Sequence, residues 1–373
     1  MRPIIAFTLA IGLAALAAAQ DSVSIYVTYG QMATEVAAFV AAEDIRGAVL
    51  AAERLNEQGG VLGRRVDIID GRATSLDDVR IKAQEQLDAD EIIAVVGANT
   101  SNMTLVVAPL FHAAGIPVVS PIATHPAVTA VGDHVFRACF TDPFQGELMA
   151  TFALDDLDAR RAVILTKVDS TYSLSLSEHF ERSFSARGEV VWTGRYLADD
   201  SDFTALLEAV RRIAPDVVFV PGHGGDAGLL LKTARALGIR AVFLGGDGWG
   251  KGVLGIAGAE AVEGGYYANH WHADVQAAQS REFVRRYTAR YGETLIAASA
   301  ALAYDAVHMI ADAITRAGSF ERRAVRNALA LTAGFEGVTG TITFNEQGDP
   351  VGKSGVVLVY RDGDIRFVRS VAP

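Results

Sequence analysis

The sequence has almost no cysteine, and its acidic residues outnumber its basic ones. Cys139 is the single cysteine among 373 residues, so no disulfide can form within the chain, and metal sites built from several cysteines are excluded. Lysine and arginine total 33 against 44 aspartate and glutamate, a formal net charge of −11. Because phosphate binding needs clustered basic side chains and no segment supplies them, nucleic acid is not an expected partner.

Long apolar runs are also missing beyond the N-terminus. Residues 4–16 are apolar except for Thr8 and Gly12, Arg2 precedes them, and three alanines follow at 17–19. This pattern predicts a signal peptide over residues 1–19, since the run is too short for a bilayer span. No cysteine follows it for a lipid anchor. We therefore expect a periplasmic or secreted chain with no direct membrane insertion.

The composition is that of a folded protein larger than one hydrophobic core usually supports. Half of the residues are hydrophobic and 21% are charged. A length of 373 residues predicts about two domains. The single thiol is expected to be buried, because residues 137–140 look like the interior of a strand.

Strand and helix patterns alternate twice along the chain, each time over about 120 residues. The apolar run 92–96 is typical of a parallel strand covered on both faces. We therefore predict an α/β fold with two doubly wound parallel-sheet lobes. A helix is expected to start at Asp44, and the last two strands are expected to form a β-hairpin around residues 361–364.

Two motifs suggest enzyme chemistry, and neither is well supported. Residues 250–255 match G-x-G-x-x-G, but they follow a late strand, and the next acidic residues come too soon for a dinucleotide site. His270 and His272 would lie on one side of a strand as a metal pair, but no third strong ligand accompanies them, so exposed strand-end histidines are favoured. We expect no enzyme activity, no cofactor and no bound metal.

The loops that follow the strands of the first half offer groups for a carboxylate. Residues 97–101 lead into a helix, where free N–H groups and the hydroxyls of Thr100 and Ser101 favour an anion, although either residue is equally suited to capping the helix. The next loop, 121–126, offers the Thr124 hydroxyl and the Ile122 carbonyl. An ordinary proline-flanked turn explains that loop equally well.

The loops of the second half offer an aromatic ring and three carboxylates. Tyr172 lies at a predicted helix start, and Asp169, Asp226 and Asp247 follow strands. Capping explains Asp226, whereas Asp247 lies among glycines that let a ligand approach, although a turn residue is an equal alternative. Together the loops suggest a site for a zwitterion, with the carboxylate on the first lobe and the amine on the second.

Several longer segments carry more specific information than any single short motif. They are residues 51–64, 114–121, 123–126, 202–204, 303–306 and 337–340, the last running into Phe344 and Gly348-Asp349. With these segments the chain resembles the periplasmic solute-binding proteins of branched-chain amino acid ABC transporters, the leucine/isoleucine/valine type. The resemblance covers essentially all of residues 22–370.

The resemblance implies a type I periplasmic-binding fold with three hinge crossings, near residues 142, 271 and 347, and a ligand cleft that closes like a flytrap. Lobe one would comprise 20–142 plus 272–347, and lobe two 143–271 plus 348–373. It further implies an amino acid or related amide as ligand, a membrane permease as partner and a monomeric state. The matching ligand-binding positions are Ser101, Ile122, Ala123, Thr124, Tyr172, His223 and Asp247.

Each of these positions has an implied role. Ser101 and Thr124 match the hydroxyls that hold the carboxylate, the Ile122 carbonyl matches an acceptor for the amine, and Tyr172 matches the ring that closes over the ligand. Asp247 replaces the usual Glu.

The sequence departs from the family at His223, which replaces a Tyr, and in the segment 31–42, which we interpret as a longer loop beside the side-chain pocket. A sensory module of the same fold is the alternative to a transport protein, and a dinucleotide enzyme is a third hypothesis.

Overall fold

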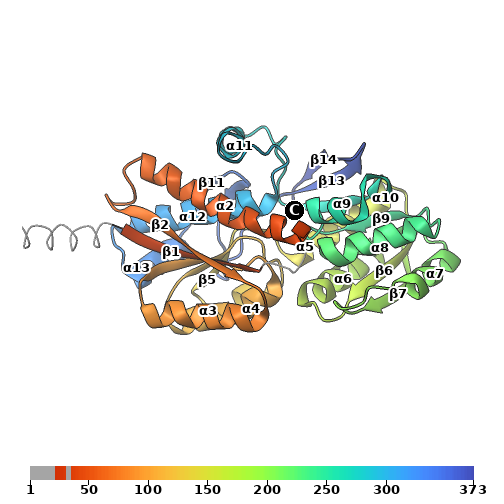
Figure 1. Cartoon of the computed structure of the whole chain (residues 1–373), viewed down its shortest axis with the longest axis horizontal. Coiled ribbons are helices and arrows are strands. Elements are labelled where there is room, and N and C mark those ends of the chain that lie inside the picture. The colour runs from red at the N-terminus through yellow and green to blue at the C-terminus, as the bar shows by residue number, and fades with distance from the viewer. Residues whose placement is uncertain (1–21, 31–34) are drawn as a thin grey trace, which may run out of the picture.

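The computed structural model describes residues 22–30 and 35–373, which form two α/β lobes side by side (Figure 1). The predicted signal peptide, residues 1–19, lies outside the described residues. Within the described part of the chain, no helix has both the length and the apolar character needed to cross a bilayer.

The first lobe contains a five-stranded, fully parallel sheet in the order β2-β1-β3-β4-β5. The central strand β3 is buried at every residue, as its unbroken apolar run predicts. The bounds are β1 (Ser22–Gly30), β2 (Arg65–Ala73), β3 (Ile92–Gly97), β4 (Val118–Ser120) and β5 (Val135–Arg137).

Helices cover both faces of this sheet. Helices α2 (Glu35–Glu57) and α12 (Ala298–Ala317) share one hydrophobic core with it, and α3 (Leu76–Ala89) and α4 (Ser101–Ala113) share another. Gly47 lets α2 approach α12 closely, because a Cβ at this position would lie 2.0 Å from the Ala300 carbonyl oxygen. The remaining elements are η1 (Pro126–Val131), α11 (Ala278–Tyr291), α13 (Arg322–Ala330), β11 (Phe335–Gly337) and β12 (Gly340–Ile342).

The second lobe contains a seven-stranded sheet in the order β14-β13-β10-β9-β8-β6-β7. It is parallel from β10 to β7, and β13 and β14 form the predicted antiparallel hairpin. The bounds are β6 (Arg161–Lys167), β7 (Glu189–Tyr196), β8 (Val217–Val220), β9 (Val242–Gly245), β10 (Tyr266–Asn269), β13 (Gly355–Arg361) and β14 (Asp364–Val371).

Two groups of helices sandwich this second sheet. Helices α5 (Asp142–Asp155) and α6 (Thr171–Phe184) pack on one face. The other face is covered by α7 (Thr204–Ile213), α8 (Gly224–Ala236), α9 (Lys251–Ala257) and α10 (Ala259–Val262). Both lobes are therefore doubly wound, as the alternating pattern predicts.

The chain passes between the sheets three times. It leaves the first lobe after β5, returns to that lobe after β10 and leaves it again after β12, so that blue C-terminal helices pack beside red N-terminal ones in Figure 1. Strands β11 and β12 form a separate two-stranded sheet. Cys139 is buried, as expected, but the prediction of a strand interior at residues 137–140 is wrong, because β5 ends at Arg137 and Cys139 lies in the first crossing.

Several local expectations are wrong. Helix α2 starts at Glu35 rather than Asp44, so most of the segment interpreted as a loop has helical backbone, while residues 31–34 lie outside the described part. His270 and His272 follow β10, which ends at Asn269, and do not lie on a strand. The packing of the whole lobe, which sequence periodicity does not report, decides these boundaries.

The glycine motif at 250–255 has a packing role. It forms the start of α9, and Gly252 faces Gly224 of α8, so closely that a Cβ on Gly224 would lie 2.8 Å from the Gly252 Cα. The close approach of two helices explains Gly252, and the positive φ of 76° explains Gly250.

Candidate ligand-binding site

A cavity of about 190 Å³ lies between the two lobes, and residues of both lobes line it. Its walls come from loops at the carboxyl ends of strands, from the helices that follow them and from the start of α12. Six of the seven predicted site residues line this cavity: Ser101, Ile122, Thr124, Tyr172, His223 and Asp247. Ala123 does not line it and is buried in the loop behind.

The lobe-one wall has the character of an anion site. Thr100 is the N-cap of α4, because its hydroxyl accepts the Met103 N–H at 3.2 Å. The Ser101 hydroxyl accepts the N–H of His125 at 3.3 Å. The Thr124 hydroxyl is buried and, within the described residues, has no hydrogen-bond partner. A helix N-terminus beside an unpartnered hydroxyl favours a carboxylate.

A buried arginine holds the Thr124 loop in place. Arg137 donates to the carbonyl of Ala123 at 3.0 Å and to the Thr129 hydroxyl at 2.9 Å, and its Nε lies 2.6 Å from Asp349 Oδ1. The Ala123 N–H donates to the Ser120 hydroxyl at 3.2 Å. Both backbone groups of Ala123 are thus engaged away from the cavity, so this residue positions Thr124.

The lobe-two wall presents a carboxylate held by two neutral donors. Asp247 accepts the Gln145 amide at 2.8 Å on Oδ1, and Oδ2 lies 2.9 Å from His270 Nε2. Burial lowers the pKa of His270, so its imidazole is neutral near pH 7 and donates from Nε2. The expectation of an exposed His270 is wrong, because the residue is 2% exposed. Neither donor is a cation that would pair with the carboxylate, and carboxylate oxygens can accept further bonds.

An aromatic pair completes the lobe-two wall. The Tyr172 ring lies 5.0 Å from the His223 ring, and the Tyr172 hydroxyl accepts the N–H of Gly248 at 3.3 Å. Burial raises the pKa of Tyr172 and lowers that of His223, so both rings are neutral near pH 7.

The other two acidic residues of the second-half loops have structural roles. Asp226 caps α8 by accepting the N–H of His223 at 3.1 Å, as predicted. Asp169 accepts the Ala198 N–H at 3.1 Å and does not line the cavity. Of these three acidic residues, Asp247 is therefore the one that lines the cavity together with residues of lobe one.

Sequence reasoning missed several cavity residues. Asp44, Asn99 and Ser299 line the lobe-one side, and Trp249 and Lys251 line the lobe-two side. Asn99 lies in a loop that sequence reasoning singled out, and its side chain accepts the Gly30 N–H at 2.9 Å. Asp44 and Ser299 lie on helices far apart in sequence, where no local pattern marks a site.

The lobes also contact each other directly beside the cavity. Asn102 Oδ1 on α4 accepts the N–H of Thr171 at 3.0 Å and its hydroxyl at 2.8 Å. The Asn102 amide donates to the Asp169 carbonyl at 3.2 Å. Lys251 on α9 forms an ion pair with Glu43 on α2 at 2.8 Å. These contacts join the two lobes around the site.

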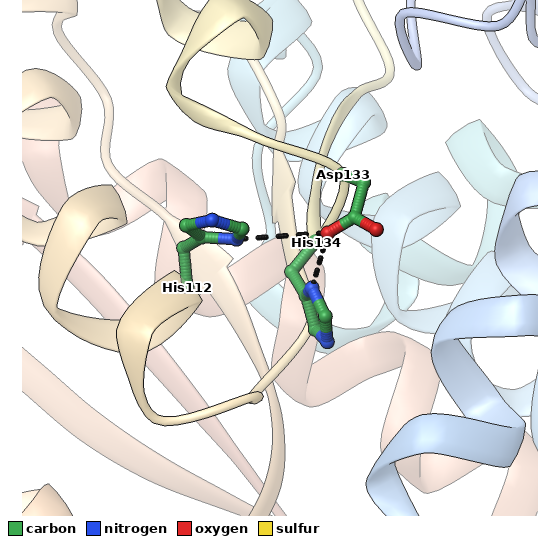
Figure 2. Close-up of side chains that lie close together, drawn as sticks. All are labelled: His112, Asp133 and His134. Carbon is green, nitrogen blue, oxygen red and sulfur yellow. Dashed lines mark hydrogen bonds and ion pairs between the residues drawn. The ribbon is translucent and has the colours of Figure 1, made fainter.

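A group of metal-ligand types lies away from the cavity (Figure 2). His112, Asp133 and His134 bring their ligand atoms within 4.8 Å of one another, and Asp133 Oδ1 lies 2.7 Å from His134 Nδ1. Arg326 lies 2.5 Å from Asp133 Oδ2. The guanidinium offsets the carboxylate charge that a cation would need, so we interpret the group as a surface ion-pair network. His270 and His272 do not converge, since His272 lies beside Asp274.

Known proteins of the same architecture have similar sequences. The family model described as periplasmic binding protein matches residues 29–364. The chain is 29% identical over 365 residues to the Leu/Ile/Val-binding protein homolog 3 of Brucella melitensis, and the alignment covers 97% of each chain.

Two solved structures superpose closely. A leucine-binding protein of Thermotoga maritima has a TM-score of 0.87 at 32% identity, covering 94% of this chain and 99% of that chain. A branched-chain amino acid transporter substrate-binding protein of Streptococcus pneumoniae, in complex with isoleucine, has a TM-score of 0.88 at 29% identity, covering 94% and 100%. These are binding proteins, not enzymes. With this fold and this interlobe cavity, the chain belongs to the periplasmic binding protein family.

Proposed function

We propose that the protein is the extracytoplasmic substrate-binding component of an ABC importer and binds a small amino acid by lobe closure. One observation carries the proposal. A single cavity joins an unpartnered hydroxyl and a helix N-terminus on lobe one to the Asp247 carboxylate on lobe two. An α-amino acid has the two opposite charges that these walls accept.

The charges of both ligand ends must be matched, because an unpaired buried charge costs several kcal/mol. The α-carboxylate would bind Ser101 and Thr124 at the start of α4. The ammonium would bind Asp247 and the Ile122 carbonyl, while Tyr172 and His223 pack against the ligand. A simple carboxylic acid would leave Asp247 without its cation, so a zwitterion is the better ligand.

Closure follows from the division of the site between lobes. A ligand contacts both walls only in the closed arrangement, so binding shifts the equilibrium toward closure. We place lobe one at 20–142 plus 272–347 and lobe two at 143–271 plus 348–373, with the three crossings as the hinge. Because one chain supplies both walls, a monomer is sufficient for binding.

The relatives support transport rather than signalling. Those named above are described as a Leu/Ile/Val-binding protein homolog, a leucine-binding protein and a branched-chain amino acid transporter substrate-binding protein in complex with isoleucine. A permease of an ABC transporter is accordingly the proposed partner. The N-terminal pattern at residues 1–19 supports export to the periplasm.

Calorimetry on the refolded, ligand-free chain tests the proposal. We expect an amino acid to bind with a dissociation constant of about micromolar or tighter. Asp247→Asn should weaken that binding by about 2 kcal/mol or more, since it removes the partner of a buried cation. The control is Asp169→Asn, outside the cavity. Unchanged affinity in the Asp247 variant, or binding of carboxylic acids alone, contradicts the proposed site.

A further inference from the structure

A second carboxylate lines the same cavity from the lobe-one side. Asp44 on α2 is 3% exposed, and its Oδ1 is buried without a hydrogen-bond partner among the residues that the structure describes. Burial raises the pKa of Asp44 to about 7, although hydrogen bonding to Ser299 and Asn99 opposes this shift. A buried acceptor that faces a cavity and lacks a partner is costly unless the ligand supplies a donor.

The cations near Asp44 are engaged by other acidic residues. Lys251 Nζ lies 2.8 Å from Glu43 Oε1 and 3.5 Å from Glu293 Oε2, and Arg46 lies 2.6 Å from Glu293 Oε1. Among the residues that the structure describes, Asp44, Glu43 and Glu293 give this cluster three carboxylates for its two cations, and Asp44 and Lys251 are its members that line the cavity. The local charge therefore favours a donor, neutral or positive, at Asp44 and disfavours an anion.

Asp44 and Asp247 line the cavity from different lobes and have different polar neighbours. Asp247 is held by Gln145 and His270 of lobe two. Asp44 has Ser299 and Asn99 of lobe one as its polar neighbours, and the charge that raises its pKa is that of Glu43. A ligand whose ammonium binds Asp247 can therefore reach Asp44 only with another part of the molecule.

We propose that Asp44 binds an N–H or O–H donor at the far end of the ligand side chain, so that the site selects amino acids with a donor-bearing side chain over purely aliphatic ones. This inference rests on the proposed function. An aliphatic side chain would exclude water from Asp44 without replacing its hydrogen bonds. A side-chain amide, hydroxyl, ammonium or guanidinium would supply them.

Matched ligand pairs test the inference by calorimetry at pH 8. Asparagine and leucine have similar shapes, and so do lysine and norleucine, but one member of each pair carries the donor. Of asparagine and lysine, the one that binds more tightly should bind the wild-type chain at least about tenfold more tightly than its aliphatic match. The two pairs distinguish a neutral amide from a cation.

Variants of Asp44 separate selectivity from folding. Asp44→Leu should weaken the donor ligand at least about tenfold and strengthen its aliphatic match, and the isosteric Asp44→Asn should fall between. Asp67→Asn, an exposed acid on β2, is the matched control, and thermal unfolding checks each fold.

The outcomes are distinguishable. Tighter binding of aliphatic amino acids, with a ratio that Asp44→Leu leaves unchanged, overturns the inference but keeps the proposed function. A folded chain that binds no amino acid overturns both.

Discussion

At the scale of single residues, two buried polar groups near the cleft explain different properties of the protein. The Thr124 hydroxyl and the Asp142 carboxyl both lack hydrogen-bond partners within residues 22–30 and 35–373. Thr124 lines the cavity, where we propose that a ligand supplies its partner, whereas Asp142 lies at the start of α5, outside the cavity lining. The first should control affinity and the second stability.

Thr124→Val should weaken amino acid binding about 10- to 100-fold, because a hydrogen bond to a charged group contributes roughly 1.5–3 kcal/mol. Folding stability should change less than affinity, since the hydroxyl makes no hydrogen bond of normal geometry among the described residues, although it lies near the Asp142 carboxyl. Thr129→Val is the control, in which stability rather than affinity should change. The Thr129 hydroxyl bonds Arg137 and Asp349, so its loss should lower the free energy of unfolding instead. Calorimetry and urea unfolding measure the two effects, and equal losses of stability would contradict this division.

Asp142→Asn should stabilise the protein at pH 8 but not near pH 4. Burial raises the pKa of Asp142 from 3.8 to about 7 in the folded chain, although hydrogen bonding to Thr124 and Ser175 opposes this shift. Between these values the folded state binds more protons than the unfolded state, so stability falls as pH rises, and the loss is complete above pH 7. The neutral amide removes this loss, which is on the order of 4 kcal/mol for a shift of about three pKa units.

Urea unfolding of the wild type and the Asn variant at both pH values measures the Asp142 effect. An equal gain at pH 4 and pH 8 would show that the charge is not the cause.

At the scale of elements, the close packing of α2 on α12 positions the lobe-one side of the cavity. Both helices contribute cavity residues, Asp44 from α2 and Ser299 from α12. Their approach depends on Gly47, which has the Ala300 backbone against it. Small side chains at the crossing therefore determine where Asp44 and Ser299 lie.

Gly47→Ala should lower the free energy of unfolding by about 1–3 kcal/mol, because the added Cβ would meet backbone that cannot move aside easily. The control is Gly225→Ala on α8, where a Cβ meets nothing within 4 Å and a helical alanine can add up to about 1 kcal/mol. Thermal unfolding of both variants checks this. A Gly47 variant as stable as the wild type would mean that α2 shifts freely against α12.

At the scale of the whole molecule, ligand binding and lobe contact are parts of one equilibrium. The bonds between Asn102 and Thr171 join the lobes without lining the cavity. They exist only when the lobes are together, so they contribute to affinity without contacting the ligand.

Asn102→Ala should therefore weaken ligand binding about 3- to 10-fold through the lost interlobe bonds, with no loss of ligand contacts. Small-angle X-ray scattering should show a larger radius of gyration for the ligand-free variant than for the ligand-free wild type. Asn327→Ala, beside Arg326 on α13, is the control. Identical affinity and scattering would show that this contact does not favour closure.

Much of the architecture follows from local sequence patterns. Apolar runs and helical periodicity predict the doubly wound lobes, because a strand covered on both faces or a helix with one buried face needs that pattern within a few residues. The polar groups in the loops at strand ends, together with the family resemblance, identify six residues that line one cavity, among them Ser101, Thr124 and Asp247. The exact ends of elements, such as the start of α2, do not follow from local patterns, since they depend on how each element packs against the rest of its lobe.

What only the tertiary structure decided is which groups face one another. Gln145, which donates to Asp247, is 102 residues away from it in the sequence. The sequence predicts an exposed His270, whereas in the fold this residue is buried beside the Asp247 carboxylate. Asp44 occupies an ordinary helical position in the sequence, and only the convergence of α2, α12 and the loop after β3 makes it a cavity wall. Local patterns report local conformation, whereas hydrogen-bond partners and burial depend on packing between distant segments.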